Sequence, residues 1–250
     1  MSKFAYTETI KEAKIFLQGD EFHHQVKVLR RKKGDRIELL DGRGGLFYGL
    51  IESIGRDRLQ VKITGAEPKT EPRPLHLLVA LPRNEKFDNI IEKAVELGVT
   101  RITPLITAHT MVKSGSAPKS ERKIVHWRKI AISSLKQSGS LFLPEIDSPT
   151  LLSKINLCGM DTGDWQEIVF HPQAHEEELT LDRLNFSSDC KTRLFLGPEG
   201  GFCKEEIDFF RFRNCSLSSL GSRILRLETA VVAALVLIQF LREKKSSLTT

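Results

Sequence analysis

Three prolines within seven residues, Pro68, Pro72 and Pro74, constrain the fold of this chain most strongly. Proline fixes the backbone angle φ and lacks an N–H, so this segment belongs in neither a helix interior nor a central strand. The sequence pattern also changes there, from short strand-like runs to alternating strand-like and helix-like runs. At 250 residues the chain is long enough for two domains. We therefore expect a first domain over residues 1–67, a linker over 68–74 and a second domain over 75–250.

The part before the prolines predicts a small, mainly β domain. Asp20 is a candidate N-cap for a short helix that runs through Arg30. The segment Asp41–Gly45 (DGRGG) supplies a glycine-rich turn between strands. The predicted strands are Arg36–Leu40, Leu46–Ile54 and Leu59–Ile63.

The part after the prolines predicts an α/β domain. Apolar residues recur at helical spacing between short strand-like runs, which is typical of a parallel sheet with covering helices. The last helix is almost wholly apolar and must bury its surface against a sheet or a partner chain. The predicted strands are Leu75–Leu81, Arg101–Thr107, Ile168–Phe170, Arg193–Leu196 and Cys215–Leu220. The predicted helices are Phe87–Leu97, Ser120–Gln137, Glu205–Phe212 and Glu228–Leu241.

The net charge of +6 is concentrated in the N-terminal quarter of the chain. Residues 1–65 hold 13 Lys and Arg against 9 Asp and Glu, and the densest basic run is Lys27–Arg36. Several cations on one face bind phosphates because counterions are released, which favours RNA as a partner. The alternative is an ordinary solvated charged face. The candidate RNA-binding residues are His23, Lys27, Arg30, Arg31, Lys32 and Lys33.

The composition argues against membrane, secreted and metal-binding classes. The longest apolar run, Ala230–Ile238, is far shorter than the roughly 20 residues that span a bilayer. The N-terminus has no apolar run of signal-peptide length. The four cysteines form no C-x-x-C pair, and no histidine lies at zinc-like spacing from them. We therefore expect a cytoplasmic protein with no metal site and no disulfide framework.

Two glycine-containing loops each follow a strand-like run and lead into a helix. The first is Leu196–Phe202 (LGPEGGF) and the second is Leu220–Ala230 (LGSRILRLETA). Such loops lie at the carboxyl ends of strands, where open α/β sheets bind ligands. The first loop lacks the G-K-[ST] ending of a phosphate-binding loop, and its Glu199 would repel phosphate. A neutral adenine or a cationic group fits it better, although a plain tight turn is the alternative.

The second loop carries apolar residues that a loop rarely needs. Ile224 and Leu225 are candidate walls of an adenine pocket, and Arg223 and Arg226 are candidates to meet an anion. The alternatives are core packing for the apolar pair and surface ion pairs for the arginines. A third strand-end loop begins at His171–Pro172, where the histidine is either functional or structural.

Several short motifs occur in a specific order along the chain: Phe22–Arg30 (FHHQVKVLR), Glu92–Pro104 (EKAVELGVTRITP), Lys136–Ser138 before Pro144, His171–Pro172, and the two glycine loops. In order and spacing, this set resembles the RsmE-type 16S ribosomal RNA uridine-N3 methyltransferases of the SPOUT superfamily. The resemblance extends from about Phe22 to Phe240.

The resemblance implies a fold and a cofactor. The fold is an N-terminal PUA-like β-barrel that binds RNA, followed by a SPOUT α/β domain whose C-terminal part forms a deep trefoil knot. Three loops enclose S-adenosylmethionine (SAM), and two subunits pair through their final helices as a homodimer. Carried onto this chain, the cofactor-binding residues are His171, Pro172, Leu196, Gly197, Pro198, Gly200, Gly201, Leu220, Gly221, Ile224 and Leu225.

The implied function is SAM-dependent methylation of a uridine at N3 in 16S ribosomal RNA, either as naked RNA or in the small subunit. As the N3 proton leaves, negative charge spreads to the ring carbonyls, and Arg226 is our candidate to stabilise it. Glu199 and Glu228 are candidate bases. The competing interpretation is a non-catalytic dimeric RNA-binding protein that uses the N-terminal domain. A nucleotide hydrolase is disfavoured because the chain has no phosphate-loop lysine.

Two positions depart from the family pattern in the segment Lys136–Ser140, at the end of the predicted helix Ser120–Gln137. A third lies just before the predicted helix Glu205–Phe212. Lys136 and Ser140 stand where many relatives have Glu and Arg, so no role is carried over to that segment. Cys203 stands where relatives have a capping Ser or Thr, a loss that costs about 1 kcal/mol. We expect the first turn of that helix to fray.

Overall fold

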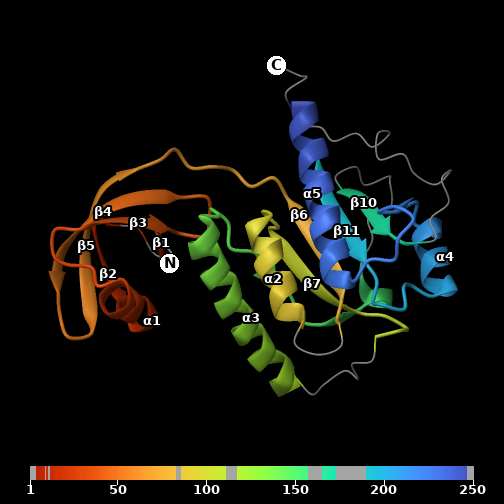
Figure 1. Cartoon of the computed structure of the whole chain (residues 1–250), viewed down its shortest axis with the longest axis horizontal. Helices are drawn as coiled ribbons and strands as arrows, with labels where there is room; N and C mark the ends of the chain where they lie inside the picture. The colour runs from red at the N-terminus through yellow and green to blue at the C-terminus, as the bar shows by residue number, and fades with distance from the viewer. Residues whose placement is uncertain are drawn as a thin grey trace. The chain divides into compact units, whose positions relative to one another are not determined.

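A computed structural model describes residues 4–8, 10, 12–82, 86–110, 117–156, 165–172 and 190–246. The chain forms two compact units (Figure 1). The first consists of Met1–Pro72 and Ala131–Leu143, and the second of Arg73–Ile130 and Pro144–Thr250.

The first unit is built on a five-stranded sheet in the order β1-β3-β4-β5-β2. Strand β1 pairs with β3 in parallel, and the other pairs are antiparallel. Alternate apolar side chains, such as Ile37, Leu39, Ile51 and Val61, point into a buried core. The strands are β1 (Phe4–Tyr6), β2 (Lys14–Gln18), β3 (Arg36–Leu40), β4 (Leu46–Ile54) and β5 (Arg58–Ala66). The three predicted strands are confirmed, while β1 and β2 were not predicted.

The helix of this unit begins one residue earlier than Asp20. Helix α1 (Gly19–His23) has Gln18 as its N-cap, so the prediction that Asp20 caps it is wrong. The chain continues as a π-helical turn, η1 (His24–Val28). It ends there because Arg30 adopts a left-handed conformation, with φ of 54°.

A segment distant in sequence, 131–143, packs within the first unit. The Leu143 N–H donates to the Gly42 carbonyl at 2.9 Å, and the Gly44 N–H donates to the Leu141 carbonyl at 2.9 Å. In the same segment, the Lys136 ammonium lies 2.8 Å from the Glu21 carboxylate, and each side chain is only 13% exposed. The cation that departs from the family pattern therefore has an acidic partner in this chain.

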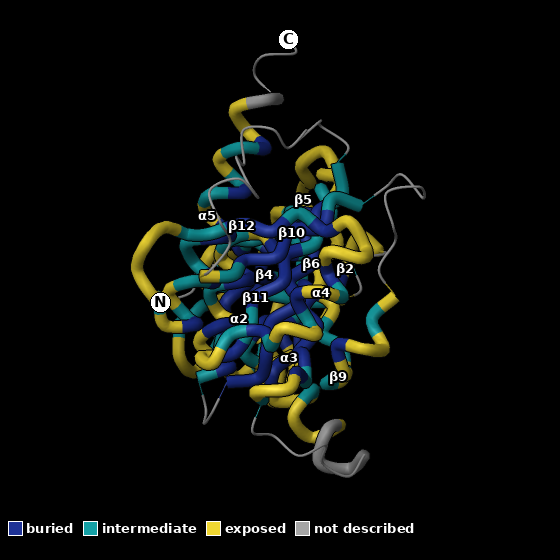
Figure 2. The backbone as a smooth tube through the Cα atoms, turned by 90° about the vertical axis from the view of Figure 1, so that its right-hand side faces the viewer, coloured by how far each residue is buried: buried dark blue, intermediate teal, exposed yellow. Residues whose placement is uncertain are grey.

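The second unit contains a parallel sheet in the order β12-β10-β11-β6-β7-β8, with β9 also paired to β7. Figure 2 shows its central strands as buried, and every residue of β6 is buried. The strands are β6 (Leu75–Ala80), β7 (Arg101–Ile106), β8 (Glu145–Ile146), β9 (Thr150–Leu151), β10 (Trp165–Phe170), β11 (Lys191–Leu196) and β12 (Ser216–Ser218). The five predicted strands are confirmed; β8 and β9 have two residues each, too few to show a periodicity.

Four predicted helices of the chain are also confirmed. They are α2 (Lys86–Glu96), α3 (Ala117–Ser138), α4 (Lys204–Phe212) and α5 (Leu227–Ser246), with a short 3-10 turn, η2, at Leu152–Lys154. Helix α5 packs against α2 and β11. One face of α5 is buried, but Val236 and Phe240 on another face are 49% and 57% exposed. None of the helices in the described ranges has both the length and the apolar character that crossing a bilayer requires.

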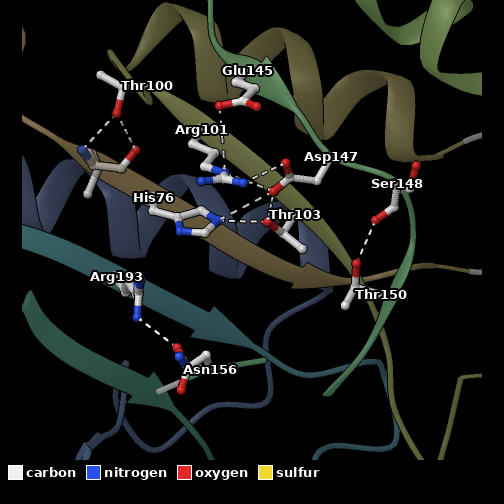
Figure 3. A network of polar contacts seen from close by, with 11 residues as sticks. His76, Thr100, Arg101, Thr103, Glu145, Asp147, Ser148, Thr150, Asn156 and Arg193 are labelled. Carbon is white, nitrogen blue, oxygen red and sulfur yellow. Dashed lines mark hydrogen bonds and ion pairs between the residues drawn. The ribbon is translucent and has the colours of Figure 1, made fainter. Parts of the chain in front are cut away.

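A partly buried polar network joins the amino ends of β6 and β7 to Asp147, which directly follows β8 (Figure 3). Arg101 donates to both carboxylate oxygens of Asp147 at 2.9 Å. The Thr103 hydroxyl donates to the same carboxylate and therefore accepts from Nε2 of His76, 2.7 Å away. The network thus assigns the proton of neutral His76 to Nε2.

The network fixes the protonation states of its members. Burial, together with the nearby cations Arg101 and Arg193, lowers the pKa of His76 to about 3, against the opposing effect of Asp147. Burial alone would raise the pKa of Asp147, but the hydrogen bonds from Arg101 and Thr103 bring it below its ordinary value. Near neutral pH the pair is therefore a neutral imidazole and an ionised carboxylate.

This arrangement predicts a loss of stability in mild acid. At pH 5 His76 in the unfolded chain is protonated, because its pKa has the ordinary value near 6.5, whereas His76 in the folded protein stays neutral. The free energy of unfolding therefore falls as the pH falls, and His76 alone lowers it by about 2 kcal/mol between pH 7 and pH 5. Urea unfolding at both pH values should show that His76→Gln, which keeps a hydrogen-bonding side chain, reduces the decline by about this amount. Equal declines in the two proteins would contradict the assignment.

Candidate functional site

Three neighbouring parallel strands, β11, β10 and β12, end at the same level of the sheet. Phe170, the last residue of β10, is in register with Leu196 of β11 and with Ser218 of β12. Just beyond, the His171 N–H donates to the Ser218 carbonyl at 2.8 Å. Because the strands are parallel, the three loops that follow them emerge side by side, as at the ligand-binding edge of open α/β sheets.

These loops line one pocket. It contains about 630 Å³ of space, including the part open to solvent, within the roughly 300–1,000 Å³ typical of small-molecule sites. Its lining residues are Phe170, His171, Pro172, Leu196, Gly197, Pro198, Glu199, Gly201, Phe202, Ser219, Leu220, Gly221, Arg223, Ile224, Leu225, Leu227 and Ala230.

Most of the residues singled out in the sequence meet here. All the predicted cofactor-binding residues line the pocket except Gly200, and the candidate base Glu199 lines it as well. Gly200, Arg226 and Glu228 are not among the described lining residues. Sequence reasoning did not identify the apolar residues Phe170, Phe202 and Leu227, which contribute to the walls.

The first glycine loop is a tight turn that leaves little room for side chains. The Gly201 N–H donates to the Pro198 carbonyl at 2.8 Å, and Gly201 has a φ of +70°, which other residues rarely adopt. A Cβ atom at Gly197 would lie 3.2 Å from the backbone nitrogen of Phe202. The turn is therefore tightly packed, and Gly197 and Gly201, which have no side chains, both line the pocket.

Contacts from the loop after β7 hold this turn from outside the pocket. Nδ1 of His109 donates to the Gly201 carbonyl at 3.0 Å. The Glu206 carboxylate accepts the Ala108 N–H at 2.8 Å and the Cys203 N–H at 2.9 Å. We expected a poorly capped start of α4 from Cys203; instead, Glu206 satisfies backbone groups there. The signal in the sequence was the capping-box spacing between these two residues.

Aromatic packing anchors the other end of the turn. The buried Phe202 ring meets Phe210 of α4 with ring centroids 5.1 Å apart, and Phe195 of β11 meets the same ring at 5.1 Å. Both contacts have the edge-on geometry that aromatic pairs favour. The loop is thus fixed to the core beneath the pocket.

The second glycine loop exposes apolar surface at the pocket. Gly221 has a φ of +107°, and its N–H donates to the Ser219 hydroxyl oxygen at 3.2 Å. Ile224 is 84% exposed, so the alternative that it packs in the core is wrong. Leu225 is partly buried and Leu227 is buried. An apolar ligand surface would cover Ile224 at this edge of the pocket.

The three candidate catalytic residues occupy different environments. Glu199 is exposed within the pocket lining. Arg226 is exposed at the start of α5, where its carbonyl accepts the Ala230 N–H at 2.9 Å. Glu228 instead lies 3.3 Å from the Lys86 ammonium. Its pKa is lowered by its backbone hydrogen bond at the helix start and, against the effect of burial, by Lys86, which makes it a weaker base.

The candidate RNA-binding residues all lie in the first unit. His23, Lys27, Arg30, Lys32 and Lys33 are exposed. Arg31 is partly buried, and its guanidinium donates to the Arg36 carbonyl. The basic run therefore leads directly to the start of β3.

The chain matches the models of two protein families. The RNA methyltransferase PUA domain matches residues 17–64, and the RNA methyltransferase domain matches residues 69–239. The ribosomal RNA small subunit methyltransferase E of Buchnera aphidicola from Schizaphis graminum is 35% identical over 227 residues, covering 90% of this chain and 89% of the relative. The Synechocystis protein of the same name is 32% identical over 246 residues, covering 94% and 76%.

Solved structures agree with this likeness. A Legionella pneumophila protein solved in complex with the bound cofactor SAM is 27% identical, with a TM-score of 0.82 and coverage of 96% of this chain and 98% of that one. A ribosomal RNA small subunit methyltransferase E from Neisseria gonorrhoeae shares the fold, with 24% identity, a TM-score of 0.81 and coverage of 96% and 98%. The fold is thus mixed α/β with an N-terminal PUA domain, and the chain belongs to the ribosomal RNA small subunit methyltransferase E family of RNA methyltransferases.

Proposed function

We propose that this protein methylates N3 of a uridine in 16S ribosomal RNA of the small subunit, with SAM as the methyl donor. The observation that supports this most strongly is the pocket built by the three aligned strand ends. Membership of the methyltransferase family supplies the reaction class. A non-catalytic RNA-binding dimer would have no need of such a pocket.

The pocket residues fit SAM by their chemistry. Leu196, Phe202 and Leu225 offer apolar walls for an adenine, and the exposed main chain of the glycine loops offers hydrogen-bonding groups for its edge. Glu199 offers a carboxylate to a cationic group. The described lining contains no lysine of the kind that binds a nucleotide triphosphate. When bound, SAM supplies an electrophilic methyl group on a sulfonium.

Arg226 is our proposed catalytic cation. Its neighbours Leu225 and Leu227 both line the pocket, and its own side chain is exposed. A uridine presented at the pocket mouth would therefore meet a guanidinium whose backbone is fixed by the start of α5. As the N3 proton leaves, that guanidinium stabilises the charge developing on the ring carbonyls.

Glu199 is the base we propose for removing the N3 proton. It lines the pocket, whereas Glu228 is paired with Lys86 and has a lowered pKa. A base must lie within hydrogen-bonding reach of the proton that it takes, and this requirement favours a carboxylate on the pocket wall.

RNA binding is assigned to the first unit in this proposal. Uridine N3 lies on the Watson–Crick edge, so the target must be unpaired or flipped out. We propose that the PUA-like barrel contacts the surrounding phosphates through the basic residues His23, Lys27, Arg30, Arg31, Lys32 and Lys33. Because ribosomal RNA is the proposed substrate, we also propose that the protein acts in the cytoplasm.

We propose a SPOUT architecture, with 68–74 as a linker and the methyltransferase domain over 75–250, from which 131–143 packs within the first unit. We propose that β12, beside β10, and the return of α5 onto β11 belong to a deep trefoil knot. We further propose that two copies pair through α5. The exposed apolar side chains Val236 and Phe240 support this, because water contact with them is unfavourable.

The site of methylation can be mapped directly. N3-methyluridine blocks base pairing, so reverse transcription across small-subunit RNA stops where the base is modified. Cells lacking this gene should lose one such stop, and the intact gene should restore it while an Arg226→Ala copy should not. An unchanged stop pattern would contradict the proposed activity.

Arg226→Ala should slow methyl transfer by about 100- to 1,000-fold, the usual effect of removing one donor that stabilises developing charge. Its affinity for SAM should stay within about twofold, since the effect belongs to the transition state. Single-turnover assays with radiolabelled SAM measure the rate of methyl transfer, and calorimetry measures the affinity for SAM. Arg211→Ala, at an exposed position on α4, is the matched control and should react normally. Near-normal turnover of the Arg226 variant would remove this residue from the mechanism.

A further inference from the structure

The outer side of the sheet in the first unit exposes large apolar side chains. Along β2 and β4, alternate residues point into the core, and the residues between them face solvent. Phe16 is 49% exposed, Tyr48 is 37% exposed and Leu50 is 36% exposed. We refer to this side of β2, β3, β4 and β5 as the outer face.

A groove lies in the outer face at Tyr48. It is formed mainly by side chains of three adjacent strands, together with Arg31 from the basic run. Its lining residues are Arg31, Arg36, Ile37, Glu38, Tyr48, Gly49, Leu50 and Thr64. The groove thus joins the exposed aromatic ring to the part of the chain with the densest positive charge.

Strand register arranges cations in a row beside the ring. Arg36 of β3 is paired with Leu50 of β4, Leu50 with Lys62 of β5, and Lys62 with Lys14 of β2. Neighbouring strands lie about 4.8 Å apart, so Arg36 and Lys62 arise about 10 Å apart on either side of Leu50. Tyr48 lies two residues before Leu50 on the same side of β4 and is therefore next to this row.

The Tyr48 ring is held in position, with space beside it on the β5 side. Its hydroxyl donates to Glu67 at 2.7 Å. The residue paired with it on β5 is Gly65, and a Cβ atom there would lie 3.8 Å from the Tyr48 ring. Strand β5 therefore supplies no side chain beside the ring at this position, whereas Glu38 of β3 is paired with Tyr48 on the other side. A planar group can approach an oriented aromatic surface.

A second aromatic site on the outer face already shows stacking by a cation. The Arg58 guanidinium lies over the Phe16 ring, 5.1 Å from its centroid. The outer face carries five cations against three carboxylates, Glu38, Glu52 and Glu67, the last of which accepts the Tyr48 hydroxyl. The cations are Lys14, Arg31, Arg36, Arg58 and Lys62. This excess attracts a polyanion and repels a second copy of the same face.

We propose that the outer face binds single-stranded RNA, with one base stacked on Tyr48 and the backbone phosphates contacted by Arg36 and Lys62. Antiparallel sheets that present aromatic rings among cations bind unpaired nucleotides in this way. The proposal rests on RNA being the substrate, and it adds a base-stacking site apart from the basic run. This site selects unpaired RNA, because a base within a duplex cannot reach the ring.

The test measures binding of a fluorescein-labelled single-stranded oligouridine by anisotropy. Tyr48→Ala should weaken binding by between about 5-fold and about 150-fold, the range for loss of one base–aromatic stack. Tyr48→Phe keeps the ring and should stay within about twofold. Phe212→Ala removes an aromatic side chain that is 82% exposed on α4 and serves as the matched control, with unchanged affinity expected.

Two further measurements identify the contact. Lys62→Ala should reduce the slope of log affinity against log salt by roughly 0.7, the value for one phosphate contact on a single strand. An oligouridine containing 4-thiouridine should crosslink under ultraviolet light to the peptide that holds Tyr48. Equal RNA affinity of Tyr48→Ala and the wild-type protein would overturn the proposal. The proposal would also be overturned if ultracentrifugation showed that Tyr48→Ala changes the oligomeric state while its RNA affinity stays the same.

Failure of this proposal can be told apart from failure of the proposed function. Tyr48→Ala should bind SAM like the wild-type protein, because the pocket lies in the other unit. If the wild-type protein methylates RNA and the Tyr48→Ala variant binds oligouridine with normal affinity, the stacking site alone is refuted. A wild-type protein that binds oligouridine through Tyr48 but transfers no methyl group would refute the proposed function alone.

Discussion

The parallel register of β10, β11 and β12 is the constraint on which the site depends. Because Phe170 is level with Leu196 and Ser218, three loops distant in sequence begin at one edge of the sheet. Each loop alone is a short turn with little binding surface. Side by side they form an apolar pocket with the carboxylate of Glu199 and the guanidinium of Arg223 in its lining, and Arg226 lies between the lining residues Leu225 and Leu227. The chemistry that we propose follows from this alignment.

The pocket keeps its shape because its loops are held from behind. His109 and Glu206 bind backbone groups of the first glycine loop and of the start of α4, while Phe202 packs into the core. Such support leaves the pocket side of the loop free for a ligand. At the opposite end of the strands, the partly buried network around Asp147 fixes the amino ends of β6 and β7. The carboxyl ends of the strands thus carry the binding site, and the amino ends carry structural contacts.

Local patterns in the sequence were sufficient for the elements with clear periodicity. The runs that form β6 and β7 are short and mostly apolar, the apolar residues of α2 recur at helical spacing, and the glycine loops mark strand ends. Pairings between distant segments leave no such pattern in the sequence. Three features depend on partners far away in the chain: the two-residue strand β8, the packing of 131–143 within the first unit, and the ion pair of Glu228 with Lys86. The groove at Tyr48 likewise appears only once three strands are in register.

The central claim is that the three aligned loops form a pocket for an adenosyl cofactor. Calorimetric titration of the full chain with SAM at several temperatures tests this most directly. We predict saturable binding at one site per chain with a negative heat-capacity change, because the ligand covers the apolar walls and the exposed Ile224. Absence of saturable binding would contradict the account.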